Sequence, residues 1–145
     1  MKDSHLGAFG AIGIFLLLLG KFLLYEQVIK KDLLFLLMAA PILSRWGMVF
    51  LAFISHPARP EGMGKIFAQN LSKKTFIYAS IWTGLLIVFI AQSKGLLLWG
   101  LTTAFLWLFR HWSYKKIQGI IGDVLGASSE LTEVMVFTAG LLVYH

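Results

Sequence analysis

Residues 119–144 read GIIGDVLGASSELTEVMVFTAGLLVY, which places three carboxylates and three glycines at the head of an apolar segment. On an α-helix, residues that recur every three or four positions lie on one face. One face of this segment therefore carries Asp123, Gly126, Ala127 and Glu130, with Glu133 at its edge. That face is acidic and has almost no bulky side chains.

Charged side chains in a membrane-spanning helix are costly, and they normally face a protein interior or a water-filled cavity. The acidic face is therefore a candidate metal site, because carboxylate oxygens suit Mg²⁺, which commonly bridges one or two carboxylates to substrate phosphates. Asp123 and Glu130 are the predicted ligands. The alternative is structural: Asp123 would stabilise the positive end of the helix dipole, and the small residues would only pack.

The composition of the whole chain indicates an integral membrane protein. Of the 145 residues, 58% are hydrophobic and 14% charged, and the mean hydropathy is +0.78, whereas about 25% charged residues is normal in a soluble domain. There is no cysteine, so a disulfide framework and a thiolate metal site are excluded. Three of the four histidines, at positions 5, 56 and 111, lie in separate polar segments without ligand spacing, and we predict no zinc site.

The chain is predicted to be an all-α, polytopic membrane protein with a single domain and about five transmembrane helices. A membrane crossing needs about 20 apolar residues. The expected spans are residues 6–25, 33–55, 76–91, 96–109 and 117–144, with short polar turns at 26–32 and 92–95 and a longer polar loop at 56–74.

The basic residues outside these spans are distributed unequally between the two sides of the membrane. One side holds Lys2, Arg59, Lys65, Lys73, Lys74, Arg110, Lys115 and Lys116, and the other holds Lys30, Lys31 and Lys94. By the positive-inside rule, the first side is predicted to be cytoplasmic. This distribution explains the net charge of +6 without a nucleic-acid partner, and it places Asp3, the loop around Arg59 and Asp123 at one membrane face.

Three further polar positions have competing interpretations, and a fourth has a structural one. The Arg59-Pro-Glu-Gly-Met-Gly loop is either a phosphate-binding loop, in which glycine amides and a guanidinium meet an anion, or an ordinary interhelical loop. For the pair Ser44-Arg45, an ion pair with an acid from another helix is favoured over a substrate contact. Lys21 is expected to extend its ammonium towards the membrane surface, with a polar cavity as the alternative. Asp3 and Ser4 are typical of a helix N-cap.

Four motifs together resemble the cobalamin synthase family, the membrane-bound adenosylcobinamide-GDP ribazoletransferases. They are KDSHLGAFG at residues 2–10, Ser44-Arg45, ARPEGMG at residues 58–64, and GDVLGASSE at residues 122–130. The resemblance implies an enzyme that joins α-ribazole, or its phosphate, to adenosylcobinamide-GDP with release of GMP, using Mg²⁺. It implies a multi-pass protein of the cell inner membrane whose site faces the cytoplasm.

The resemblance also implies roles for individual residues. Asp123 and Glu130 are the expected catalytic and metal-binding residues. The expected substrate- or phosphate-binding residues are Asp3, Ser4, Ser44, Arg45, Arg59, Glu61, Gly62 and Gly64. Lys21, which lies outside the four motifs, is added to them for the alternative in which it reaches a polar cavity.

The chain departs from the family pattern in one respect. It has no counterpart of an upstream aspartate-rich segment, and it resembles the C-terminal three-fifths of a full-length enzyme. We therefore expect a fragment that is inactive alone, with other cobalamin-assembly proteins or further copies of itself as partners. A split enzyme and a gene remnant are alternatives.

A different class of function is a non-catalytic membrane subunit or transporter, in which Lys21, Arg45 and the acids form a charged path. Ionisable residues gathered at the cytoplasmic end would favour the transferase, and a line of them through the midplane would favour transport.

Overall fold

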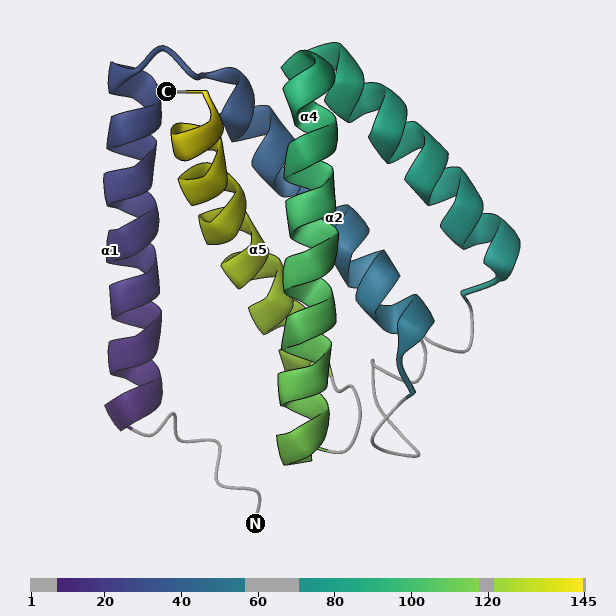
Figure 1. Ribbon diagram of the computed structural model, residues 1–145. Helices are drawn as coiled ribbons and strands as arrows, with labels where there is room; N and C mark the ends of the chain where they lie inside the picture. Colours follow the sequence, from purple (N-terminus) through teal and green to yellow (C-terminus); the bar gives the residue numbers. More distant parts are fainter. Residues whose placement is uncertain (1–7, 57–70, 118–121, 145) are drawn as a thin grey trace.

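The structure is a computed structural model that describes residues 8–56, 71–117 and 122–144. The described residues form α-helices and contain no strand. The helices are α1 (Ala8–Lys30), α2 (Phe35–Ile54), α4 (Lys73–Ile117) and α5 (Gly122–Val143), shown in Figure 1. Three of them, α1, α2 and α4, are long and apolar enough to cross a membrane.

Helix α4 is a hairpin of two arms. The backbone leaves helical geometry at Gln92, which has φ 54° and ψ −151°, and the two arms meet at this bend and diverge from it (Figure 1). Gly95 permits this close return, because a Cβ there would lie 2.7 Å from the carbonyl oxygen of Ile87. The turn expected at residues 92–95 is thus confirmed, while the count of five membrane crossings stays a prediction.

The boundaries of the other segments differ modestly from the predicted ones. Helix α1 continues to Lys30, so most of the expected turn at 26–32 is helical. An ion pair between Glu26 and Lys30 stabilises this last turn of the helix. The chain reverses instead at Asp32, where φ is 56°. Helix α5 begins at Gly122, five residues later than the start of the predicted span at 117.

The core lies between α2 and α5, which pack against each other over much of their length. Leu36 and Leu43 of α2 and Phe137 of α5 are fully or almost fully buried. Gly140 allows close contact, because a Cβ there would lie 2.5 Å from a methyl carbon of Leu36. Helix α4 packs against this pair, whereas α1 contacts mainly α5 and barely reaches α2.

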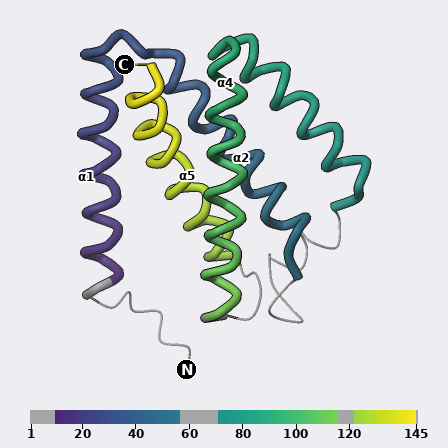
Figure 2. The backbone as a smooth tube through the Cα atoms, in the orientation of Figure 1, coloured from purple at the N-terminus to yellow at the C-terminus, as the bar shows by residue number. Residues whose placement is uncertain are grey.

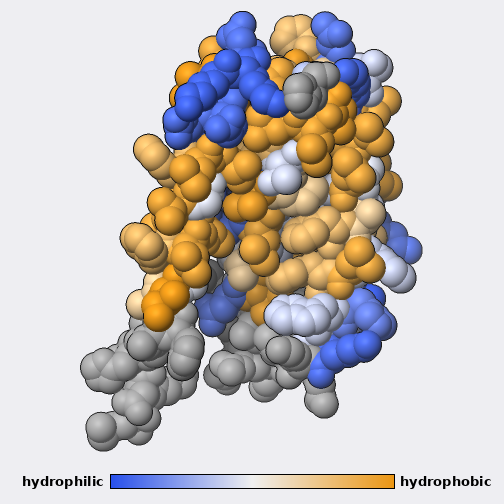
Figure 3. Space-filling view, turned by 60° about the vertical axis from the view of Figure 1, so that its left-hand side comes forward, coloured by the Kyte–Doolittle hydropathy of each residue, from blue (hydrophilic) through white to orange (hydrophobic). Residues whose placement is uncertain are grey.

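The helix ends alternate between two polar surfaces separated by an apolar band. Figure 2 shows that α1 and the second arm of α4 have one end at the lower surface, and that the 31–34 turn and the Gln92 bend lie at the upper surface. Figure 3 shows the apolar band between polar groups on one face of the molecule. Among the described basic residues, Lys73, Lys74, Arg110 and Lys115 therefore lie towards one end, and Lys30, Lys31 and Lys94 towards the other.

Candidate functional site

Helix α5 carries a group of polar residues that lie inside the apolar band. Asp123 is in its first turn and is exposed, as expected for an acid at the positive end of a helix dipole. One to three turns later, α5 presents Ser129, Glu130, Thr132 and Glu133, whose i, i+1, i+3 and i+4 spacing places them on a single broad face. This face points towards α1 and α2.

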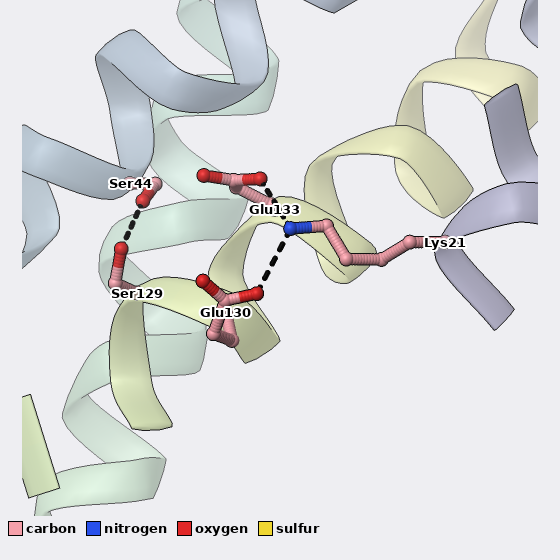
Figure 4. A network of polar contacts seen from close by, with 5 residues as sticks. All are labelled: Lys21, Ser44, Ser129, Glu130 and Glu133. Carbon is pink, nitrogen blue, oxygen red and sulfur yellow. Dashed lines mark hydrogen bonds and ion pairs between the residues drawn. The ribbon is translucent and has the colours of Figure 1, made fainter. Parts of the chain in front are cut away.

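Lys21 of α1 bridges the two glutamates (Figure 4). Its Nζ lies 2.9 Å from Oε2 of Glu130 and 2.6 Å from Oε2 of Glu133. The side chains of Lys21 and Glu133 are 11% and 14% exposed, whereas that of Glu130 is 47% exposed. The favoured prediction for Lys21 was therefore wrong: its ammonium does not extend to the membrane surface, because two carboxylates within reach compensate its charge inside the band.

A second polar contact joins α2 to the same face. The hydroxyl groups of Ser44 and Ser129 are 2.6 Å apart and buried (Figure 4). Thr132, one turn further along, is fully buried, and its hydroxyl has no hydrogen-bond partner among the described residues. The α5 face thus offers one unused hydroxyl beside the cluster of Lys21, Glu130 and Glu133.

The outer side of this cluster borders a groove between α1 and α5. The groove has a volume of about 490 Å³ and is lined by Gly10, Gly13, Ile14, Leu17, Leu18, Ala127, Glu130 and Leu131. Among the described residues that line it, Glu130 is the only ionisable one. With both glutamates and Lys21 ionised, the cluster has one excess negative charge, and the exposed carboxylate that borders the groove belongs to Glu130. A cation or a hydrogen-bond donor in the groove would meet that carboxylate.

Asp123 and Glu130 lie on the same side of α5 but at different heights. They are seven residues apart, which corresponds to about 10 Å along a helix that rises about 1.5 Å per residue. An ion shared by both carboxylates would require the two side chains to extend towards each other along the helix, and Glu130 would have to leave its contact with Lys21. Within the described residues, no three side chains of His, Asp or Glu gather as a metal site.

Arg45 does not form the predicted ion pair with any described residue. Its side chain is exposed, and its guanidinium lies 3.6 Å from the sulfur of Met48. Ser44 faces α5, so the next residue, about 100° further round the helix, points away from α5 towards α4. The structure therefore separates Arg45 from the other mid-helix charges.

The remaining predicted site residues lie outside the described part of the chain. They are Asp3, Ser4, Arg59, Glu61, Gly62 and Gly64. Their roles stay predictions. Conversely, sequence reasoning assigned no role to Ser129 or Thr132, and it placed Glu133 only at the edge of the acidic face, although the spacing of Glu133 three residues after Glu130 was a usable signal.

The arrangement of charges does not form a path across the membrane in the described residues. Lys21, Glu130 and Glu133 form one compact cluster, Arg45 lies on another side of α2, and Asp123 lies at the start of α5. A transport path would require ionisable groups in a line through the apolar band. The geometry therefore does not favour the transporter alternative.

Comparison of the sequence with known proteins identifies one family. The family model described as "Cobalamin-5-phosphate synthase" matches residues 1–141. An adenosylcobinamide-GDP ribazoletransferase of Clostridium kluyveri is 31% identical over 140 residues, covering 93% of this chain and 54% of that protein. A protein of the same name from Syntrophobacter fumaroxidans is 34% identical over 149 residues, covering 99% of this chain and 58% of that protein.

The chain thus spans little more than half the length of these curated relatives. No solved structure matches it. The family match nevertheless extends into all four described helices, including the polar face of α5 and the helix that carries Lys21. The chain belongs to the cobalamin-5-phosphate synthase family.

Proposed function

We propose that the chain forms part of an adenosylcobinamide-GDP ribazoletransferase, which joins α-ribazole or its phosphate to adenosylcobinamide-GDP with release of GMP. The observation that carries the proposal is the family match over residues 1–141. Because the chain spans little more than half the length of its relatives, we assign it one wall of the site. The rest of the enzyme would supply the facing wall, and the chain alone would be inactive.

Two parts of this wall have different roles in the proposal. Asp123 is exposed at the start of α5, where the positive end of the helix dipole also favours anions. The cluster of Lys21, Glu130 and Glu133 fixes α1 against α5 and keeps the carboxylate of Glu130 on the wall of the groove. Asp123 would therefore lie at the phosphates of the substrate, and the groove beside Glu130 would hold a less polar part of it.

The exposed carboxylate of Asp123 fits Mg²⁺, because this ion is commonly held by one or two carboxylates together with substrate phosphates. Glu130 fits less well as a direct ligand, because the ammonium of Lys21 lies 2.9 Å from its oxygen and repels a divalent cation. When bound, the ion would neutralise charge on phosphate oxygens as GMP leaves. In the proposal, Asp123 holds the ion and Glu130 contacts substrate.

We place the site at the cytoplasmic face of the cell inner membrane. Asp123 lies near the end of the bundle where α4 begins with Lys73 and Lys74 and where its second arm carries Arg110 and Lys115. An excess of basic residues marks the cytoplasmic side of a membrane protein. Nucleotide-linked substrates would reach Asp123 from that side.

A chimera tests the activity. The chain would replace the matching part of the Syntrophobacter fumaroxidans relative, so that the rest of that protein supplies the facing wall. In membrane vesicles with Mg²⁺, α-ribazole and adenosylcobinamide-GDP, the chimera should release GMP and form the joined product. Asp123→Ala should lower the rate by at least about 100-fold, the scale of losing a group that stabilises transition-state charge.

Asp32→Ala is the matched control, because Asp32 is also an exposed acid but lies in the turn at the opposite surface. It should leave the rate unchanged. An active chimera whose rate is insensitive to Asp123→Ala would remove Asp123 from the site while keeping the transferase assignment. A folded chimera that yields no product would overturn the assignment.

A further inference from the structure

Arg45 is a cation near the middle of an apolar helix. It is the eleventh residue of the 20-residue helix α2, so about 15 Å of helix separates it from either end. An arginine side chain reaches roughly half that distance when it extends towards the membrane surface. Its guanidinium therefore stays within the apolar band, where an uncompensated charge is costly.

The guanidinium borders a groove between α2 and the first arm of α4. This groove has a volume of about 500 Å³, and apart from Arg45 its lining is Pro41, Ile42, Trp46, Val49, Ala79, Trp82, Thr83 and Leu86. None of these side chains is an anion. The indole N–H of Trp46 already donates to the hydroxyl of Ser80 at 3.0 Å. The groove thus has apolar walls and a single positive charge.

The described acids of the chain are engaged elsewhere or lie at another height. Glu130 and Glu133 bind Lys21, and Glu26 binds Lys30. Asp32 lies in the turn before α2, and Asp123 lies six residues, about 9 Å, before the serine that contacts Ser44. For the same reason, the described residues of a second copy offer no free carboxylate at the height of Arg45.

We propose that this groove is the docking site for a further transmembrane helix that carries a carboxylate opposite Arg45. A helix fits because the walls are apolar and open to the lipid along α2 and α4. A carboxylate fits because it would pair with the guanidinium through two parallel hydrogen bonds. The partner helix comes from a protein segment outside the described residues of this chain.

The test uses the full chain in phosphatidylcholine vesicles and synthetic membrane-spanning peptides as probes. Because the chain has no cysteine, Ser93→Cys at the exposed α4 bend gives a single site for a donor dye. The probes are Leu/Ala helices of about 20 residues with an acceptor dye and one central Asp, Lys or Leu. Energy transfer should show the Asp peptide binding about threefold to twentyfold more tightly than the Leu peptide, the range of interhelical polar contacts in membranes.

Charge variants decide whether Arg45 is responsible. Arg45→Gln should abolish the preference for Asp, and Arg45→Glu should reverse it in favour of the Lys peptide, a gain that a misfolded protein would not show. Arg110→Gln is the matched control, because Arg110 lies near the end of α4 and contacts Ser55, so the preference should persist. Equal binding of the Asp and Leu peptides, including no binding of either, or an Asp preference that survives Arg45→Gln, would overturn the proposal.

Discussion

Lys21 and Arg45 are both cations inside apolar helices, but they differ in exposure and in their acidic partners. Lys21 lies between α1 and α5, is 9% exposed and contacts two carboxylates. Arg45 is exposed at the groove between α2 and α4, and no described acid contacts it. The charge of Lys21 is compensated within the chain and stabilises the interface between α1 and α5. The charge of Arg45 has no such partner among the described residues, and it marks the groove between α2 and α4 as a surface for another helix.

Replacing Lys21 should have the largest effect on stability. Lys21→Leu removes the only described cation next to Glu130 and Glu133, and breaking a buried ion pair costs about 3–5 kcal/mol. Unfolding by sodium dodecyl sulfate in mixed micelles, followed by helical circular dichroism, measures the change. A loss below about 1 kcal/mol would show that the cluster does not hold α1 to α5.

The two glutamates should differ from each other. Glu133→Gln should cost about 1.5–3 kcal/mol, the value of a hydrogen bond to a charged group, because Glu133 makes the shorter and more buried contact with Lys21. Glu130→Gln should cost less than half as much, since Glu130 makes the longer contact with Lys21 and its side chain borders the groove instead of being enclosed. The same titration compares them, and a larger effect at Glu130 would contradict this ranking.

The hydroxyl contact between α2 and α5 should contribute less than the ion pairs. Ser129→Ala leaves the hydroxyl of Ser44 buried without its described partner. Polar contacts between membrane helices average about 0.6 kcal/mol, so we expect a loss of about that size in the titration. The control is Thr138→Ala, because the hydroxyl of Thr138 is exposed and bonds only within its own helix; an equal loss there would refute a special role for Ser129.

Arg45→Leu should have the smallest effect on the isolated chain. No described acid loses its partner, and the groove gains an apolar side chain, so the free energy of unfolding should fall by no more than about 0.5 kcal/mol, as for surface substitutions. The mixed-micelle titration gives the value. A loss comparable to that of Lys21→Leu would mean that a residue of this chain outside the described ranges pairs with Arg45.

The sequence predicted the architecture better than it predicted the contacts. Apolar runs and turn residues were enough to locate the helices and the bend at Gln92, because length and hydropathy are local properties. The acidic face of α5 was also predictable from helical spacing. The ends of α1 and α5 were not, since polar residues such as Glu26 continue a helix when they pair across one turn.

The partners of the mid-helix charges could not be predicted in the same way. Lys21 and Glu130 are 109 positions apart in the chain, and their meeting depends on how α1 packs against α5. A lysine that extends to the surface and a lysine that is buried against two acids have the same local sequence. For Arg45, the expectation of a partner rested on the cost of a buried charge, which states that a partner is needed but not which segment provides it.

Helix α1 is held more firmly at its C-terminal half than at its N-terminal half. Its C-terminal half is anchored by Val28, which is fully buried, and by the ring of Tyr25, which meets Phe137 at 5.0 Å. Its N-terminal half borders the groove, and a Cβ added at Gly13 would meet nothing within 4 Å. If α1 tilted by about 10° about Lys21, the backbone at Gly10 would move by about 3 Å, given about 1.5 Å of helix per residue. The contacts of α1 at Lys21 thus control the width of the groove near Gly10, eleven residues earlier in the same helix.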